Sequence, residues 1–424
     1  MLRKDGLARN SAWMLLGQTG RLALQATTFM IVAARLGAAG YGLFAGVLAF
    51  VSTVAPFAGA GAGNVLVRDV AREPQRFCEC WSRALMTICL FGCGALAVVV
   101  LLSGVLLPQQ TPLLLIAAVG LADLLFARLV ELYGFAFQAR EMLRCTALVQ
   151  LGASSFKCGA AALLLLTPSG SSLMWGVLYC GASAIAGSLG FLFVSLQLGW
   201  PTKWALPRLK DVKDGVLFST SAGCQSLYND ADKVILANST TLTTVGTYAT
   251  AYRICDVTFA PISALLAAAY ARFFKAGGQS VREAQRLAAR LLAPALGYTL
   301  FAALALIVIG EGLETLLGAT YAGLSEMLSV LSWLCVLRAC HYFAADALTG
   351  AGYQGVRVIM QIIVAVAAVA LGVLIIPEYS WRGAATLSLC CDGLLATLMW
   401  AGLTIVAARG RRARSHMEAR EELR

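Results

Sequence analysis

The sequence predicts an all-α polytopic membrane protein with twelve transmembrane helices in two six-helix lobes and both termini in the cytoplasm. Its composition, its apolar stretches and its charge distribution each predict part of this. Of the 424 residues, 59% are hydrophobic and 13% are charged, and the mean hydropathy is +0.77. A soluble globular protein has roughly a quarter charged residues. This chain is therefore expected to use lipid as its solvent.

Twelve stretches are mainly apolar over about 20 residues, the length that crosses a bilayer as an α-helix. They are centred near residues 23, 54, 95, 123, 155, 184, 227, 258, 300, 336, 367 and 394. No segment between them is long enough to fold as a separate domain. An even number of helices places both ends of the chain on the same side of the membrane.

The basic residues of the connecting segments predict which side that is. If the amino terminus is cytoplasmic, nearly all of them lie in inner loops, and the predicted outer loops contain only Arg35 and Arg382. This is the positive-inside pattern. The net charge of +11 thus reflects topology, and we expect no binding of nucleic acid.

The first two apolar stretches form a predicted helical hairpin. A glycine-rich turn at 35–42 joins the arms 11–34 and 43–66, and Pro56 interrupts the second arm. The first arm carries polar residues at spacings of three, four and three, which places them on one helix face. They are Gln18, Arg21, Gln25 and Thr28. This face is too polar for lipid and is expected to line the protein interior.

The pattern of the first hairpin returns in the second half. Residues 244–249 echo 40–45, and 259–261 echo 54–56, at an offset of 204 to 205 residues. Two echoes in the same order predict a tandem duplication of six helices. The predicted segments are an N-terminal lobe (1–198), a cytoplasmic linker (199–214), a C-terminal lobe (215–408) and a charged cytoplasmic tail (409–424).

Three segments carry a family resemblance: the turn 35–44, the run 232–236 and the run 246–253. They resemble the Wzx-type polysaccharide flippases of the multidrug/oligosaccharidyl-lipid/polysaccharide (MOP) exporter superfamily, which also contains the multidrug and toxin extruders. The resemblance implies a two-lobed exporter of the bacterial inner membrane. Such a protein moves an undecaprenyl-diphosphate-linked oligosaccharide to the outer leaflet by alternating access, for surface polysaccharide synthesis. It also implies the pathway's polymerase and glycosyltransferases as partners.

Polar residues inside the predicted spans are the candidate substrate contacts. An ionisable group in hydrocarbon costs at least about 2.5 to 3.5 kcal/mol, so it needs a partner or a watery cavity. Arginine suits a diphosphate, because its planar fork forms two charge-assisted bonds to phosphate oxygens. Amides and hydroxyls suit a sugar. The predicted substrate-binding residues are Arg21, Gln18, Gln25, Lys157, Gln150, Gln225, Asn229 and Arg253, the last of which the resemblance favours.

Several of these cations have an alternative, purely structural interpretation. Arg21 and Lys157 have no acidic neighbour one turn away on their own helices, which favours contact with phosphate. The alternative is pairing with Asp123 or Glu131 from the fourth helix. Arg128 lies three residues before Glu131, and the two are expected to pair with each other or to reach the inner membrane interface.

The second half contains the acidic candidates. Asp230, Asp232 and Asp256 are predicted ion-coupling residues. The first two could equally form a helix-packing ion cluster with Lys233. Asp256 lies three residues after Arg253, and these two could satisfy each other. A basic excess among intramembrane residues is present only in the first half, so a cationic site is predicted only there.

Two prolines occupy matching positions in the repeated hairpins. Pro56 and Pro261 each remove a backbone hydrogen bond inside a helix, which predicts either a packing kink or a hinge. The sequence shows no nucleophile–base pair, glycine-rich phosphate loop or metal-ligand cluster, so we expect a transporter without catalytic residues, metal or cofactor. The alternatives are a cation-coupled multidrug extruder and, with less support because the outer loops are short, a polysaccharide polymerase or ligase.

Overall fold

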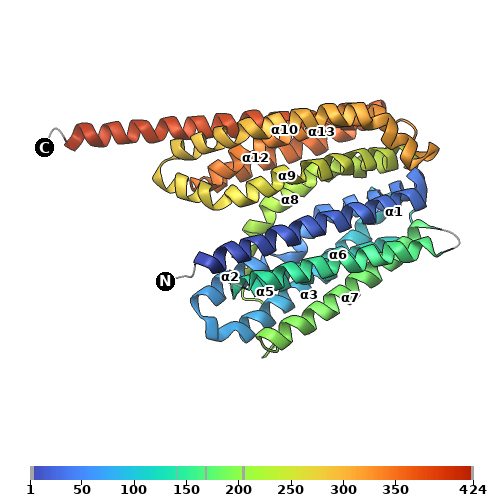
Figure 1. The fold of residues 1–424 in the computed structure, drawn as a ribbon, viewed down its shortest axis with the longest axis horizontal. Coiled ribbons are helices and arrows are strands. Elements are labelled where there is room, and N and C mark those ends of the chain that lie inside the picture. The colour runs from blue at the N-terminus through green and yellow to red at the C-terminus, as the bar shows by residue number, and fades with distance from the viewer. Residues whose placement is uncertain (1–3, 141, 168–169, 203–205, 422–424) are drawn as a thin grey trace. The chain divides into compact units, whose positions relative to one another are not determined.

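The computed structural model describes residues 4–140, 142–167, 170–202 and 206–421, and all regular structure in these ranges is helical (Figure 1). The chain divides into two compact units, Met1–Gly246 and Thr247–Arg424. Each unit is described by itself. The predicted lobes, 1–198 and 215–408, with a linker between them, remain a prediction.

The described residues of the first unit form eight complete helices, the start of α9 (Leu242–Gln279) and two short turns, one wound more tightly than an α-helix and one more widely. The helices are α1 (Lys4–Gly59), α2 (Ala62–Arg72), α3 (Phe77–Leu106), α4 (Leu113–Gly120), α5 (Ala127–Ala139), α6 (Leu143–Leu165), α7 (Ser172–Leu198) and α8 (Leu209–Ser239). A 3₁₀ turn, η1 (Pro74–Arg76), precedes α3, and a π-helical turn, η2 (Leu121–Phe126), joins α4 to α5. The aromatic core of this unit centres on Trp81 and Tyr133, which are fully buried.

Helix α1 holds both arms of the predicted hairpin. Its backbone leaves helical geometry only at Gly37, with φ at 66°, so the predicted turn at 35–42 narrows to a single residue. A positive φ is accessible to glycine because it lacks a Cβ atom. The second break follows α1, where Ala60 and Gly61 have φ of 41° and 63°. The interruption predicted at Pro56 therefore lies four residues early, because the helix continues through the proline to Gly59.

The second arm of α1 packs tightly along α8. At each contact a Cβ atom added to a glycine would come within 3.1 Å of the other helix. The pairs are Gly42 with Gly246 just beyond α8, Gly46 with Ala237, Phe57 with Gly223, and Gly61 with Gly215. Along these pairs the residue numbers on the α1 side rise while those on the α8 side fall, so the two helices run antiparallel. We call this contact the glycine seam; missing side chains let the two backbones approach closely.

The second unit contains most of α9 (Leu242–Gln279), α10 (Val281–Leu317), α11 (Leu324–Leu331), α12 (Leu334–Gly350) and α13 (Gln354–Glu421), with a 3₁₀ turn η3 (Ala319–Tyr321). Helix α13 is broken at Ser380, where φ is 53° and ψ is −138°. Helix α9 contains Pro261 and continues through it. At its far end α9 meets α12, where a Cβ atom on Gly277 would overlap the backbone of Gly350.

The chain is a multi-pass membrane protein. Nine helices of the described residues are long and apolar enough to cross a bilayer. Two of these, 19–70 and 354–408, contain 52 and 55 residues, more than twice the roughly 20 that one crossing needs. They are the helices with breaks near Gly37 and Ser380. Large apolar side chains such as Leu101 and Val308 are more than three-quarters exposed, as expected of a surface that faces lipid.

Candidate functional site

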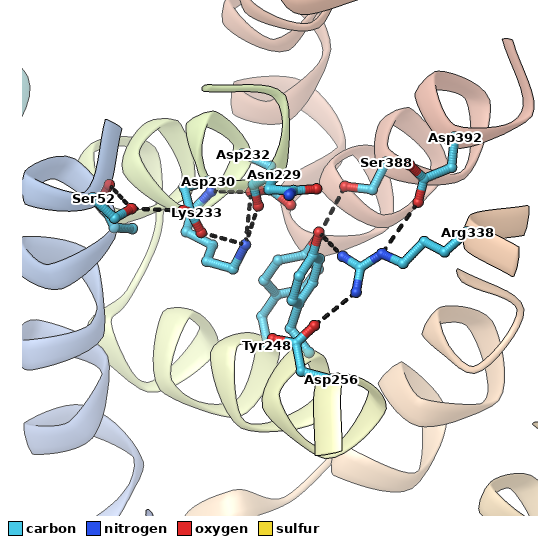
Figure 2. A network of polar contacts seen from close by, with 12 residues as sticks. Ser52, Asn229, Asp230, Asp232, Lys233, Tyr248, Asp256, Arg338, Ser388 and Asp392 are labelled. Atoms are coloured by element: carbon cyan, nitrogen blue, oxygen red, sulfur yellow. Dashed lines mark hydrogen bonds and ion pairs between the residues drawn. The ribbon is translucent and has the colours of Figure 1, made fainter. Parts of the chain in front are cut away.

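The polar residues of α8 form a compact ion cluster in the first unit. The Lys233 ammonium lies 3.2 Å from an Asp230 carboxylate oxygen and 3.3 Å from one of Asp232. It also donates to the backbone carbonyl of Asn229. Ser52 of α1 points toward this cluster and donates a 2.6 Å hydrogen bond to Asp230 (Figure 2). The cluster therefore ties α8 to α1 at the middle of the glycine seam.

This arrangement bears on the predicted ion-coupling role of Asp230 and Asp232. Both carboxylates share the single Lys233 ammonium, so the three groups carry a formal charge of −1. Asp232 and Lys233 are buried, whereas Asp230 is a quarter exposed at its side chain. The contacts of Asp230 and Asp232 with Lys233 match the helix-packing ion cluster considered from the sequence. Ion coupling by these two residues remains a prediction.

A second network lies in the other unit and centres on Arg338 of α12, which is buried together with His341 and Asp392. Its guanidinium donates a 2.7 Å hydrogen bond to Asp256 of α9 (Figure 2). It donates another to the Tyr252 hydroxyl. Its Nε atom lies 3.5 Å from an Asp392 oxygen of α13, and His341 Nε2 lies 3.3 Å from the other oxygen. The network thus joins three helices of this unit.

Pairing of Arg253 with Asp256, considered from their spacing of three, is wrong. Asp256 binds Arg338, which lies 82 residues away in the sequence. Arg253 is half-buried. Its predicted contact with substrate remains a prediction.

Lys157 of α6 is paired with Asp123, which was the structural alternative to contact with phosphate. Its ammonium donates a 2.7 Å hydrogen bond to the Tyr179 hydroxyl of α7, which in turn donates a 2.7 Å bond to Asp123 of η2. Lys157 Nζ also lies 3.8 Å from Asp123 and 4.0 Å from the centre of the Tyr179 ring. The cation is therefore already compensated, and of the two predicted phosphate contacts Arg21 is the stronger candidate.

Arg21 is half-buried, and its Nε atom is buried without a hydrogen-bond partner among the described residues. The arm that carries it packs in parallel along α6, since Gly17 meets Ala147 and Gly20 meets Leu151. These contacts place Arg21 at the level of Gln150 on α6, and both side chains are half-buried.

The other predicted amide contacts occupy separate positions. Gln25 is half-buried one turn beyond Arg21, and Gln225 is half-buried on α8 with Asn229. The side chain of Gln18 lies outside the described residues. The structure thus brings Arg21, Gln25 and Gln150 to one helix pair, whereas Gln225 and Asn229 lie on α8 and Arg253 belongs to the other unit.

A cavity of about 280 Å³ opens beside the break between α1 and α2. Its polar lining includes Asn64, Arg128, Glu131, Ser219 and Ser226, with Phe135 beside them. Arg128 and Glu131 form the expected ion pair, at 2.7 Å.

Sequence reasoning missed this cavity, although the run of alternating alanine and glycine at 58–63 marks its wall. It also missed Ser52, Tyr179 and Tyr252, because nothing in the local pattern shows which polar group of another helix each would meet. Among the described residues, no group of three or more His, Cys, Asp or Glu is arranged to hold a metal ion.

The helical arrangement is that of MATE transporters. The chain is similar to a structure titled the inward-facing conformation of a multidrug resistance MATE family transporter of the MOP superfamily, with a TM-score of 0.71 and 13% identity over 92% of this chain and 96% of that one. The chain is also similar to a structure titled the outward-facing conformation of such a transporter, with a TM-score of 0.68 and 13% identity over 96% of this chain and 97% of that one. For a structure of MATE in complex with MaD3S, the TM-score is 0.65 and the identity is 14%, over 96% of this chain and 97% of that one. At these identities the likeness shows the fold.

The family follows from the sequence match. The family model for polysaccharide biosynthesis proteins matches residues 7–276, which is more than half of the chain. The chain belongs to this family. No curated protein matches it significantly. The resemblance seen in the repeated hairpins is confirmed at the level of the family and of the MOP fold.

Proposed function

We propose that the protein is a flippase that moves an undecaprenyl-diphosphate-linked oligosaccharide from the cytoplasmic to the outer leaflet by alternating access. The observation that carries the proposal is membership of the polysaccharide biosynthesis family in a chain with the fold of MOP transporters. A polysaccharide pathway that uses lipid-linked units needs a transporter for them. The protein is accordingly a transporter and not an enzyme.

The polar groups of the first unit support a diphosphate-bearing substrate. Arg21 has a buried guanidinium nitrogen with no partner among the described residues, and a buried donor without a partner costs about 1–3 kcal/mol. A phosphate oxygen would satisfy this donor with a charge-assisted hydrogen bond. Gln25 and Gln150, on the same helix pair, offer amide groups to the adjoining part of the substrate.

The proposed topology has twelve spans with both termini in the cytoplasm of the bacterial inner membrane. Nine helices among the described residues are long and apolar enough to cross the membrane. The breaks divide α1 and α13 into two arms each, which adds two spans, and α8 supplies the twelfth. Basic residues gather at the proposed cytoplasmic end, where Arg76, Arg83 and Arg208 surround Glu79. Membrane lipids, and the polymerase and glycosyltransferases of the pathway, are the proposed partners.

The second candidate function is a cation-coupled multidrug extruder, which the likeness to MATE structures favours. Such a protein needs acidic groups available to a cation. Asp230 and Asp232 share Lys233, and Asp256 binds Arg338, so each of these carboxylates already contacts a basic side chain. The family match and this compensation together favour the flippase.

Arg21→Gln is expected to lower transport about tenfold or more, because a charge-assisted hydrogen bond contributes about 1.5–3 kcal/mol. In a deletion strain, diphosphate-linked units should accumulate in the cytoplasmic leaflet. Wild type should clear them, and a normally inserted Arg21→Gln should not. The matched control is Arg382→Gln, which alters an exposed ion pair with Glu326.

Other outcomes of this experiment would contradict the proposal. Accumulation in the outer leaflet would indicate a polymerase or ligase. No accumulation, with changed sensitivity to cationic drugs, would indicate the extruder.

Pro56 and Pro261 remain hinge candidates. Both lie inside continuous helix, and Pro56 is followed within five residues by the break at Ala60 and Gly61. If the prolines are hinges, the Pro56→Ala/Pro261→Ala double variant should slow the exchange of conformations, measured as transport rate at saturating substrate. An unchanged rate would leave them as packing kinks.

A further inference from the structure

The cavity beside the α1–α2 break is walled by backbone. Gly61 takes a φ of 63°, and a Cβ atom on it would lie 2.5 Å from the Cα atom of Gly215 on α8. On the other side, the Phe135 ring of α5 rests on Gly63, where an added Cβ atom would come within 2.1 Å of the ring. Glycine at these positions brings α8 and α5 against the break and leaves their polar side chains around one space.

The charges lining this cavity cancel. Arg128 Nη1 lies 2.7 Å from Glu131 Oε2, and these two are the charged residues of the lining. A diphosphate placed here would meet the Glu131 carboxylate as well as the guanidinium. A neutral ligand incurs no such repulsion, so the lining disfavours both the anionic part of the proposed substrate and a cation.

The lining offers donors, acceptors and an apolar surface together. The Arg128 Nε atom is buried and has no hydrogen-bond partner among the described residues. Asn64 is exposed, and Ser226 is half-buried beside the buried Ser219. A sugar hydroxyl both donates and accepts, which suits this mixture of amide, hydroxyl and carboxylate groups. Phe135 supplies an apolar surface for the carbon–hydrogen face of a ring.

The volume of the cavity fits a single sugar ring. Small-molecule pockets begin at roughly 300 Å³, so a cavity of about 280 Å³ is sized for one small ligand and not for an oligosaccharide. We propose that this cavity binds one neutral sugar ring of the lipid-linked glycan, at a position separate from the diphosphate contact at Arg21. The assignment rests on the proposed flippase function and adds the residues that recognise the sugar.

The test is a binding measurement on the full-length protein in lipid nanodiscs with two probes. One is undecaprenyl diphosphate without sugar, and the other is the glycan-bearing lipid extracted from the deletion strain. The Asn64→Ala/Ser226→Ala double variant removes two polar groups with little change in packing, and Ser219→Phe fills the cavity. Ser239→Ala, an exposed position on α8, is the control.

Both cavity variants should weaken binding of the glycan-bearing lipid about tenfold or more, the double variant through two lost hydrogen bonds and Ser219→Phe by occupying the space of the ring. Their binding of the sugar-free lipid should match that of the control. Arg21→Gln should weaken both lipids. This contrast separates sugar recognition from recognition of the diphosphate.

Two results would overturn the assignment while leaving the flippase intact: equal weakening of both lipids by the cavity variants, or no weakening of either. Unfolding temperatures measured on the same samples show whether an equal loss of binding comes from misfolding. If Ser219→Phe is misfolded, the result for the Asn64→Ala/Ser226→Ala variant decides. Wild-type protein that binds neither lipid would overturn the proposed function together with this assignment.

Discussion

Arg338→Met is expected to destabilise the protein by about 3–5 kcal/mol, because it leaves a buried carboxylate without its cation. Asp392, 3% exposed, would keep only His341 as a charged partner among the described residues, and Asp256 would lose its 2.7 Å hydrogen bond. Methionine replaces the volume of the side chain and none of its donors. Folded yield and unfolding temperature should both fall.

Buried cysteines provide the measurement. Cys255, Cys335 and Cys391 are buried in the same unit and should react with a thiol-specific dye only on unfolding. Arg382→Met is the matched control, since its pair with Glu326 is exposed and contributes about 0–1 kcal/mol. Equal dye-reaction midpoints for the two variants would show that the buried network does not support this unit.

Gly246→Ala is expected to destabilise the protein although alanine is the better helix former. A Cβ atom at this position would lie 1.7 Å from the Ala38 carbonyl oxygen and 2.9 Å from the Gly42 nitrogen. These are backbone atoms that cannot move without shifting α1. Overpacking of this kind costs about 1–3 kcal/mol and occasionally more.

Gly94→Ala on α3 is the matched control, because nothing lies within 4 Å of the added atom. In a helix interior alanine is favoured over glycine by about 0.5–1 kcal/mol, so this variant should be unchanged or more stable. Gly246→Ala should therefore lower the unfolding temperature, whereas Gly94→Ala should leave it unchanged or raise it. An equal change in the two variants would contradict the close backbone contact at this end of the glycine seam.

The helices could be predicted from the sequence because each depends on about 20 neighbouring residues. Eleven of the twelve predicted centres fall inside α-helices and the one at 123 falls in the π-helical turn η2, and the local ion pair of Arg128 with Glu131 is confirmed. The exact breaks were harder to predict. The helix continues through Pro56, and the break comes four residues later at Ala60 and Gly61, where Gly61 lies against Gly215 of α8.

The candidate sites were less predictable, because their partners come from other helices. Asp256 has Arg253 nearby in the sequence and binds Arg338 instead, and Lys157 reaches Asp123 through Tyr179, which shows no signal of its own. The cavity combines residues of five helices, α1, α2, α3, α5 and α8. No single-helix pattern contains that information.

The π-helical turn η2 separates two chemical environments on one continuous helix. Within it lies Asp123, bound to Tyr179, and just after it come Arg128 and Glu131. The Ala127 amide bonds the Ala122 carbonyl five residues back, which adds one residue to that turn. If the same residues were wound as regular α-helix, the extra residue would rotate α5 by about 100° and carry Arg128 and Glu131 off the cavity while Asp123 stayed in place. The wider turn thus lets a single transmembrane segment present its two polar sites in different directions.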